Sequence, residues 1–293
     1  MDLSNLSFFY GESVDVDAIG TLIYRRLEAQ KFDGTLLHDF DLIVLIVHEE
    51  QDTELAVEHT RIGDQPCQVL HVSIESLERL LIAGEKGDLV SCFMEGELVQ
   101  DQGDRLFALR RDYIEFDKPL RDRKMLYEFS RFLCIYVDAK RYMQEGYVID
   151  AYQCVLDSLK HWARIELIER GVLPDKAVWE QVKELNTAIH KLYEELTQST
   201  ETIRQRVELV LLACEFSVMS KMAECSVLLL QILKSRPQPW SIEELIMHPE
   251  LRMLKNELPQ VIRKLVNRSL VKETVVWSEF SRYGSQGIRY CAE

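Results

Sequence analysis

The sequence lacks the features that mark a membrane or a secreted protein. No uninterrupted apolar run approaches the roughly 18 to 20 residues of a membrane-spanning helix, and the N-terminus has no basic region followed by an apolar export segment. The seven cysteines are odd in number and never spaced Cys-x-x-Cys, so neither a disulfide framework nor a zinc site is expected. These absences predict a cytoplasmic protein with reduced thiols and no membrane partner.

The chain has little positive charge in its N-terminal part. Residues 1–117 carry 25 acidic and 9 basic side chains, a net charge of −16, whereas residues 118–231 carry 17 and 16, and residues 232–293 carry 7 and 10. Non-specific affinity for nucleic acid comes mainly from Lys and Arg side chains that displace counterions. The N-terminal part is therefore expected to act on a small molecule or a protein rather than on a long nucleic acid.

Two aspartates stand directly before the most apolar segment of the chain. Asp39 and Asp41 are separated by Phe40, and residues 42–47 are all Leu, Ile or Val, as in a buried strand. Since residues i and i+2 of a strand point to one face, both carboxylates are expected side by side. Two carboxylates on a rigid element can hold Mg²⁺ against a triphosphate. The motif is short, and two solvated aspartates before a core strand are the alternative.

The surroundings of this pair resemble a known arrangement. Gly34 and Thr35 form a glycine turn before the acidic strand, residues 67–72 are a second apolar run, and residues 74–83 have helical periodicity. This order resembles the nucleotidyltransferase fold of the polymerase-beta type, in which a Gly-Ser turn precedes two acidic residues on the next strand. Residues 87–101 resemble the closing hairpin region of kanamycin nucleotidyltransferase-type members. The likeness extends to bacterial nucleotidyltransferase-like proteins with a helical middle domain and a C-terminal helix-turn-helix.

The resemblance implies roles for these residues. Asp39 and Asp41 would be catalytic and would ligate Mg²⁺, and Gly34 and Thr35 would contact a nucleoside triphosphate. Two features depart from the family pattern: the Gly34-Thr35 turn lies too close to Asp39, and the following strand offers His71 and no third carboxylate.

The function expected is metal-dependent nucleotidyl transfer to, or nucleotide binding with, an unidentified small-molecule or protein acceptor. The alternative is a catalytically silent regulator, or a DNA-binding or interaction protein, that acts through the C-terminal domain. The sequence is also compatible with a homo-oligomer, in which the partner is a second copy of the chain.

The expected architecture is of the α+β class, with three domains. They are a nucleotidyltransferase-like α/β domain (residues 1–117), a helical bundle (118–231) and a winged helix-turn-helix (232–293). After Asp117 the apolar residues recur with a 3.6-residue period, which predicts helices over residues 125–143, 148–169, 177–196 and 201–223. No histidine follows an Arg by five residues, so helical ribonucleases with an Arg-x-x-x-x-His signature are not indicated.

The last domain combines helices with a strand pair. Helices are expected over residues 225–233, from Ser241 onward and over 257–267, and strands over 270–277 and 288–290. This order resembles a winged helix-turn-helix, and a net charge of +3 permits contact with DNA. The side chains that would then contact DNA are Arg263, Lys264, Arg268, Arg282 and Arg289. The alternative is a domain that binds protein or only supports the fold.

Overall fold

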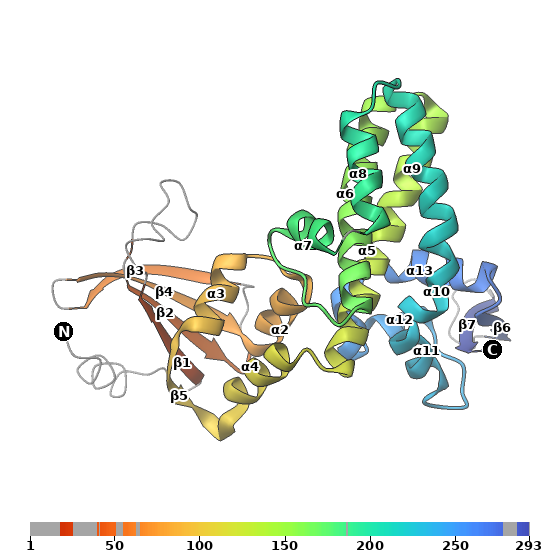
Figure 1. Cartoon of the computed structure of the whole chain (residues 1–293). Helices are drawn as coiled ribbons and strands as arrows, with labels where there is room; N and C mark the ends of the chain where they lie inside the picture. Colours follow the sequence, from red (N-terminus) through yellow and green to blue (C-terminus); the bar gives the residue numbers. More distant parts are fainter. Residues whose placement is uncertain are drawn as a thin grey trace. The chain divides into compact units, whose positions relative to one another are not determined.

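The computed structural model describes residues 18–25, 40, 42–50, 55–62, 65–185, 187–277 and 286–292. The chain divides into two compact units, Met1–Asp117 and Lys118–Glu293. Figure 1 shows that the first unit is built around a sheet and that long helices dominate the second.

A five-stranded mixed sheet forms the centre of the first unit, in the order β3-β4-β2-β1-β5. Its strands are β1 (Ala18–Arg25), β2 (Leu42–His48), β3 (Ala56–Ile62), β4 (Gln65–Ser73) and β5 (Glu97–Asp101). The apolar run that follows the two aspartates is the central strand β2, and all seven of its residues are buried. β2 runs parallel to β4 and antiparallel to β1.

Two helices connect β4 to β5 and pack against the sheet: α2 (Ile74–Ala83) and α3 (Gly87–Glu95). The Ser73 hydroxyl accepts a hydrogen bond from the backbone N–H of Ser76 at 3.1 Å and begins α2, and Gly84, with φ of 65°, ends it. The expected hairpin region over residues 87–101 is therefore wrong in its first part, because α3 buries Leu89 and Phe93 at helical spacing.

A short 3₁₀ turn, η2 (Gln102–Asp104), and helix α4 (Arg105–Glu115) complete the described part of the first unit. The Asp101 carboxylate accepts hydrogen bonds from the backbone N–H groups of Leu106, at 3.1 Å, and Phe107, at 2.9 Å. Leu106 also fills the space above Gly20 of β1, where a Cβ would lie 2.3 Å from the Leu106 side chain. Glycine at position 20 thus lets α4 close on the sheet.

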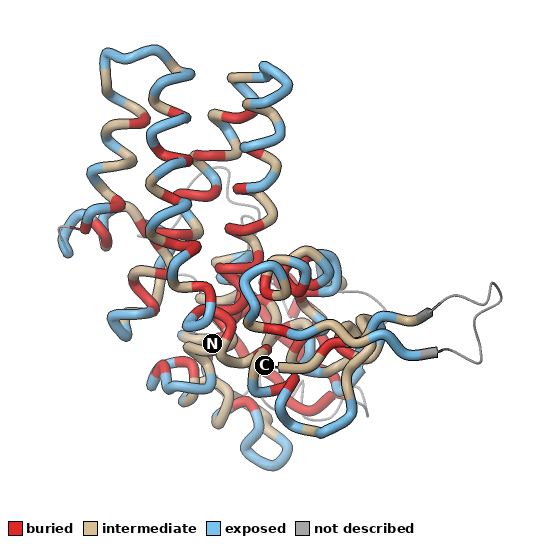
Figure 2. Tube along the Cα trace, turned by 90° about the vertical axis from the view of Figure 1, so that its right-hand side faces the viewer, coloured by how far each residue is buried: buried red, intermediate tan, exposed pale blue. Residues whose placement is uncertain are grey.

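The second unit is mainly helical. Its first five helices are α5 (Lys118–Glu145), α6 (Val148–Glu169), α7 (Val178–Glu184), α8 (Ala188–Gln198) and α9 (Ile203–Ser217). α5 and α6 pack along each other, and α9 packs on α6. Figure 2 shows buried positions recurring along these helices, as amphipathic periodicity predicts.

Two of the predicted helices are interrupted. The expected helix over residues 177–196 is divided into α7 and α8, because the Thr187 hydroxyl donates to the Val182 carbonyl at 3.1 Å while its backbone is extended. The expected helix over residues 201–223 stops at Ser217 and is followed by η3 (Met219–Lys221) and α10 (Met222–Cys225).

The C-terminal part of this unit contains four helical segments and a strand pair. They are α11 (Val227–Lys234), α12 (Ile242–Ile246), η4 (Pro249–Leu254), α13 (Leu258–Asn267), β6 (Val271–Trp277) and β7 (Gln286–Ala292). The helix expected from Ser241 onward is α12, and a capping box begins it: the Ser241 hydroxyl and the Glu244 carboxylate each accept the other residue's backbone N–H. The identification of these elements as a winged helix-turn-helix stays a prediction.

Among the described residues, one helical stretch, Ile203–Lys234, meets the length and composition of a membrane span. It contains α9, η3, α10 and α11, and its apolar window is 44% buried within the protein. Val207, Val210 and Cys214 have no exposed surface. These residues are part of the core of the second unit.

Candidate functional site

The four residues that the sequence assigned to nucleotide and metal, Gly34, Thr35, Asp39 and Asp41, lie outside the described residues. Phe40, between the two aspartates, is described, and its ring centroid lies 4.6 Å from that of His59 on β3. Asp41 is followed directly by Leu42, the first residue of the central strand. In the chain, the acidic pair therefore leads into β2.

A buried amide side chain, that of Gln68 on β4, lies level with the start of β2. Leu42 is level with Cys67 of β4, and Ile43 is level with Gln68. Gln68 is only 1% exposed; its Nε2 lies 3.4 Å from Nε2 of His59, and its Oε1 has no hydrogen-bond partner among the described residues. Since buried polar atoms are almost always paired, this oxygen is an acceptor that the described part of the chain leaves open.

His71 does not stand where a third carboxylate would help the acidic pair. It is level with Ile46, four residues beyond Leu42, or about 13 Å along the strand at roughly 3.3 Å per residue. Its Nδ1 lies 2.9 Å from Nε2 of His48, and its Nε2 lies 3.9 Å from a carboxylate oxygen of Glu58. The absence of a third carboxylate on this strand, noted from the sequence, is therefore not made up by His71.

No group of three or more His, Cys, Asp and Glu side chains is arranged to hold a metal ion in the described part of the chain. A metal site at Asp39 and Asp41 stays a prediction.

A second cluster of charged side chains is buried between α5 and α6. Glu128 is 3% exposed; its Oε2 lies 2.6 Å from Nδ1 of His161, and its Oε1 accepts a hydrogen bond from Arg164 at 3.2 Å. Lys124, one turn before Glu128, is also 3% exposed, and burial lowers its pKa to about 8. The sequence predicted no such cluster, although the Lys124–Glu128 spacing places two charges on one helix face.

Two of the predicted DNA-contacting residues pair with carboxylates of the same unit. Arg263 pairs with Glu273 on β6. The Arg289 guanidinium donates to the Glu244 carboxylate and to the Pro239 carbonyl, both at 3.1 Å. Arg282 lies outside the described residues.

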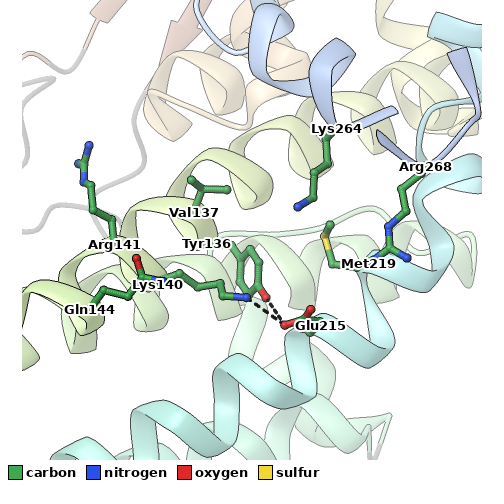
Figure 3. A pocket seen from close by; sticks show the side chains of 9 residues that line it. All are labelled: Tyr136, Val137, Lys140, Arg141, Gln144, Glu215, Met219, Lys264 and Arg268. Atoms are coloured by element: carbon green, nitrogen blue, oxygen red, sulfur yellow. Dashed lines mark hydrogen bonds and ion pairs between the residues drawn. The ribbon is translucent and has the colours of Figure 1, made fainter. Parts of the chain in front are cut away.

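Two of the five predicted residues, Lys264 and Arg268, lie in one pocket and are one turn apart at the C-terminal end of α13. They line a pocket of about 300 Å³ with side chains of α5, α9 and η3 (Figure 3). The remaining lining residues are Tyr136, Val137, Lys140, Arg141, Gln144, Glu215 and Met219. The sequence gave no signal for this pocket beyond the two basic residues, because its walls come from helices far apart in the chain.

Comparisons with known proteins agree with the architecture. Residues 13–123 match the family model described as nucleotidyltransferase-like, and residues 122–221 match the model described as the YgxA-like substrate binding domain. The chain is 26% identical over 251 residues to the uncharacterized protein YgxA of Bacillus subtilis (strain 168), a match that covers 86% of this chain and 85% of that protein.

A solved structure has the same fold along its whole length. The crystal structure of a nucleotidyltransferase-like protein from Exiguobacterium sibiricum 255-15 matches with a TM-score of 0.86 and 24% identity, over 99% of each chain. Together with the family model over residues 13–123, this match shows that the chain has a nucleotidyltransferase-like, mixed α and β fold.

Proposed function

We propose that the protein binds a nucleoside triphosphate with Mg²⁺ through Asp39 and Asp41 and transfers the nucleotidyl group to an acceptor hydroxyl, which loses its proton while pyrophosphate leaves. The observation that carries the proposal is the sequence Asp39-Phe40-Asp41 directly before β2, the buried central strand of a nucleotidyltransferase-like fold. Gly34 and Thr35 are the residues that we assign to the triphosphate.

The donor chemistry of this site suits Mg²⁺, which prefers carboxylate oxygens. Bound there, the ion would neutralise triphosphate charge. The contribution of the protein is rigidity, because β2 is hydrogen-bonded on both sides and buried over its whole length. A further carboxylate, Asp64, directly precedes Gln65, the first residue of β4, and lies outside the described residues. We propose it as the third acidic group, since β2 and β4 are parallel neighbours.

The second unit would supply the acceptor site. Support comes from the substrate binding domain model that matches residues 122–221. A net charge of −16 over residues 1–117 favours a small-molecule or protein acceptor over a long nucleic acid.

A second candidate function belongs to the C-terminal elements, which we propose to be a winged helix-turn-helix because three helices precede a strand pair. In this alternative the nucleotidyltransferase-like unit is silent, and residues 232–293 bind DNA or a protein. Two of the five predicted DNA contacts, Arg263 and Arg289, already pair with Glu273 and Glu244. That observation favours a protein or a small molecule over DNA.

The test is calorimetric titration of the full chain with each nucleoside triphosphate, with and without Mg²⁺. Wild-type protein is expected to bind one of them in a Mg²⁺-dependent manner, and the double variant Asp39→Asn, Asp41→Asn is expected to lose the Mg²⁺-dependent part of the affinity. Asp64→Asn is expected to weaken it as well. The matched control, Asp112→Asn with Glu115→Gln, removes two exposed charges from α4 and should leave the affinity unchanged. Unaltered Mg²⁺-dependent binding by the double variant would refute the assignment.

A further inference from the structure

The pocket between α5, α9 and α13 carries an excess of positive charge. Four cationic side chains and one carboxylate line it, and all come from the single compact unit Lys118–Glu293. Figure 3 shows Lys264 and Arg268 extending from α13 toward the side of the pocket where Tyr136, Met219 and Glu215 lie.

The carboxylate in the pocket already has its partners. Glu215 accepts hydrogen bonds from the Lys140 ammonium and the Tyr136 hydroxyl, both at 3.1 Å. Lys140 first, and then Tyr136, hold the pKa of Glu215 below its usual value, with a further contribution from the charge of Lys264. Arg141, in turn, pairs with Asp138 at 2.9 Å. These contacts offset the charges of Lys140 and Arg141, but they leave the α13 pair uncompensated.

Lys264 and Arg268 have no ion-pair partner among the described residues. Lys264 lies in the last turn of α13 and Arg268 is its C-cap residue, four positions further on. The other face of α13 is fixed, because Leu258, Val261 and Ile262 have no exposed surface. The C-terminal end of the helix therefore presents two neighbouring cations to the pocket.

The position of α13 on α5 is held by ion pairs outside the pocket. Arg131 of α5 pairs with Glu257, directly before α13, at 2.8 Å. Arg123 contacts Glu250 of η4 through two nitrogens, at 2.6 and 2.7 Å. Two-point contacts of this kind restrict orientation as well as distance. The pocket walls are thus preformed, which lowers the entropic cost of binding a ligand.

We propose that this pocket binds a small molecule that carries a phosphate group. A phosphate monoester has a charge of about −1.5 to −2 near neutral pH and three acceptor oxygens, which match an arginine fork and lysine ammonium groups. The pocket has a volume of about 300 Å³, several times the roughly 30 Å³ that one water molecule takes in the liquid. A phosphate group would therefore leave part of the pocket unfilled. The additional space is bordered by Val137 and Met219, which suit the organic part of the ligand.

A duplex nucleic acid fits these observations less well. DNA-binding domains place several cations along one exposed surface, whereas here Arg263 and Arg289 are paired with carboxylates and the uncompensated cations line a cavity. The phosphate site does not depend on nucleotidyl transfer in the first unit.

The test is calorimetric titration of the full chain at constant ionic strength with sn-glycerol 3-phosphate, inorganic phosphate, glycerol, acetate and a short DNA duplex. Wild-type protein is expected to bind glycerol 3-phosphate more tightly than inorganic phosphate and to bind neither glycerol nor acetate. Lys264→Gln and Arg268→Gln are each expected to weaken the binding at least tenfold, because each removes one charge-assisted contact. Lys255→Gln removes an exposed lysine outside the pocket and should change the affinity less than twofold.

Glu215→Gln provides a test of opposite sign. The amide oxygen can still accept from Lys140 and Tyr136, but the negative charge is lost, so glycerol 3-phosphate should bind several-fold more tightly. The double variant Asp39→Asn, Asp41→Asn should bind it as the wild type does. Three results would overturn the proposal: no heat with glycerol 3-phosphate at millimolar concentration, equal losses in Lys255→Gln and Lys264→Gln, or weaker binding by Glu215→Gln. Duplex binding that needs Lys264 and Arg268, without binding of glycerol 3-phosphate, would replace the small molecule with DNA.

Discussion

Glu128 contacts His161 and Arg164 inside the second unit and lies one turn from Lys124. Removing its charge leaves the Lys124, His161 and Arg164 side chains without their central anion, and breaking one side of a buried ion pair typically costs about 3 to 5 kcal/mol. We therefore expect Glu128→Gln to lower the free energy of unfolding by about that amount, measured by urea unfolding followed by circular dichroism. Glu145→Gln, an exposed change on the same helix, should cost less than about 0.5 kcal/mol. Equal effects of the two changes would contradict a charged role for Glu128.

The buried thiols predict that the free energy of unfolding decreases at alkaline pH. All seven cysteines are free, and burial raises the pKa of Cys92, Cys214 and Cys225 to about 12. An unfolded thiol ionises near pH 8.5, so above about pH 9 the unfolded state binds fewer protons and the free energy of unfolding falls, by about 1.4 kcal/mol per pH unit for each thiol. Lys124, with its pKa lowered to about 8, makes the free energy of unfolding rise with pH up to about pH 10.4. This single group offsets only part of the loss that the three thiols cause.

Cys92→Ala separates this effect from simple loss of packing. The variant should be less stable than the wild type at pH 7, yet its stability should fall less steeply above pH 9, because one titrating thiol is gone. Urea unfolding at a series of pH values gives both slopes. Parallel slopes would mean that Cys92 ionises equally easily in the folded and unfolded protein.

The start of α12 depends on a single carboxylate. Glu244 accepts the Ser241 backbone N–H at 2.7 Å and contacts Arg236 at 2.8 Å and Arg289 at 3.1 Å, so it links the helix to β7. We expect Glu244→Ala to lower the free energy of unfolding by about 1 to 2 kcal/mol and to speed amide hydrogen exchange in β7. Glu243→Ala, at the exposed neighbouring position, should do neither. Unchanged exchange in β7 would show that Arg289 does not depend on Glu244.

The sequence predicted elements where local periodicity is strong and failed where a single side-chain contact or a distant contact decides. α6 follows the expected range of residues 148–169, and the capping box of α12 could be found from Ser241 and Glu244 alone. The break between α7 and α8 depends on one local hydrogen bond, from Thr187 to Val182, which no periodicity encodes. The pocket was missed for a different reason, since α5 and α13 meet only in the folded unit.

For the whole molecule, the division into two compact units predicts two calorimetric transitions. Each ligand should then act on one of them: a nucleoside triphosphate with Mg²⁺ on the unit Met1–Asp117, and glycerol 3-phosphate on the unit Lys118–Glu293. A ligand at one hundred times its dissociation constant stabilises its unit by about 2.7 kcal/mol. Scanning calorimetry with each ligand separately is the measurement. If each ligand alone raises the temperatures of both transitions, the two units unfold cooperatively and the prediction is wrong.

The ion pair between Arg131 and Glu257 joins residues that are 126 positions apart in the chain. A ribosome adds roughly 5 to 20 residues per second, so α5 leaves the exit tunnel about 6 to 25 seconds before the residues that will cover it. During that interval the face that carries Tyr136 and Lys140 can already meet Glu215 of α9, but it lacks α13. Binding by this pocket therefore requires a finished polypeptide: a chain truncated before α13 would retain most of the helices of the second unit and none of its phosphate affinity.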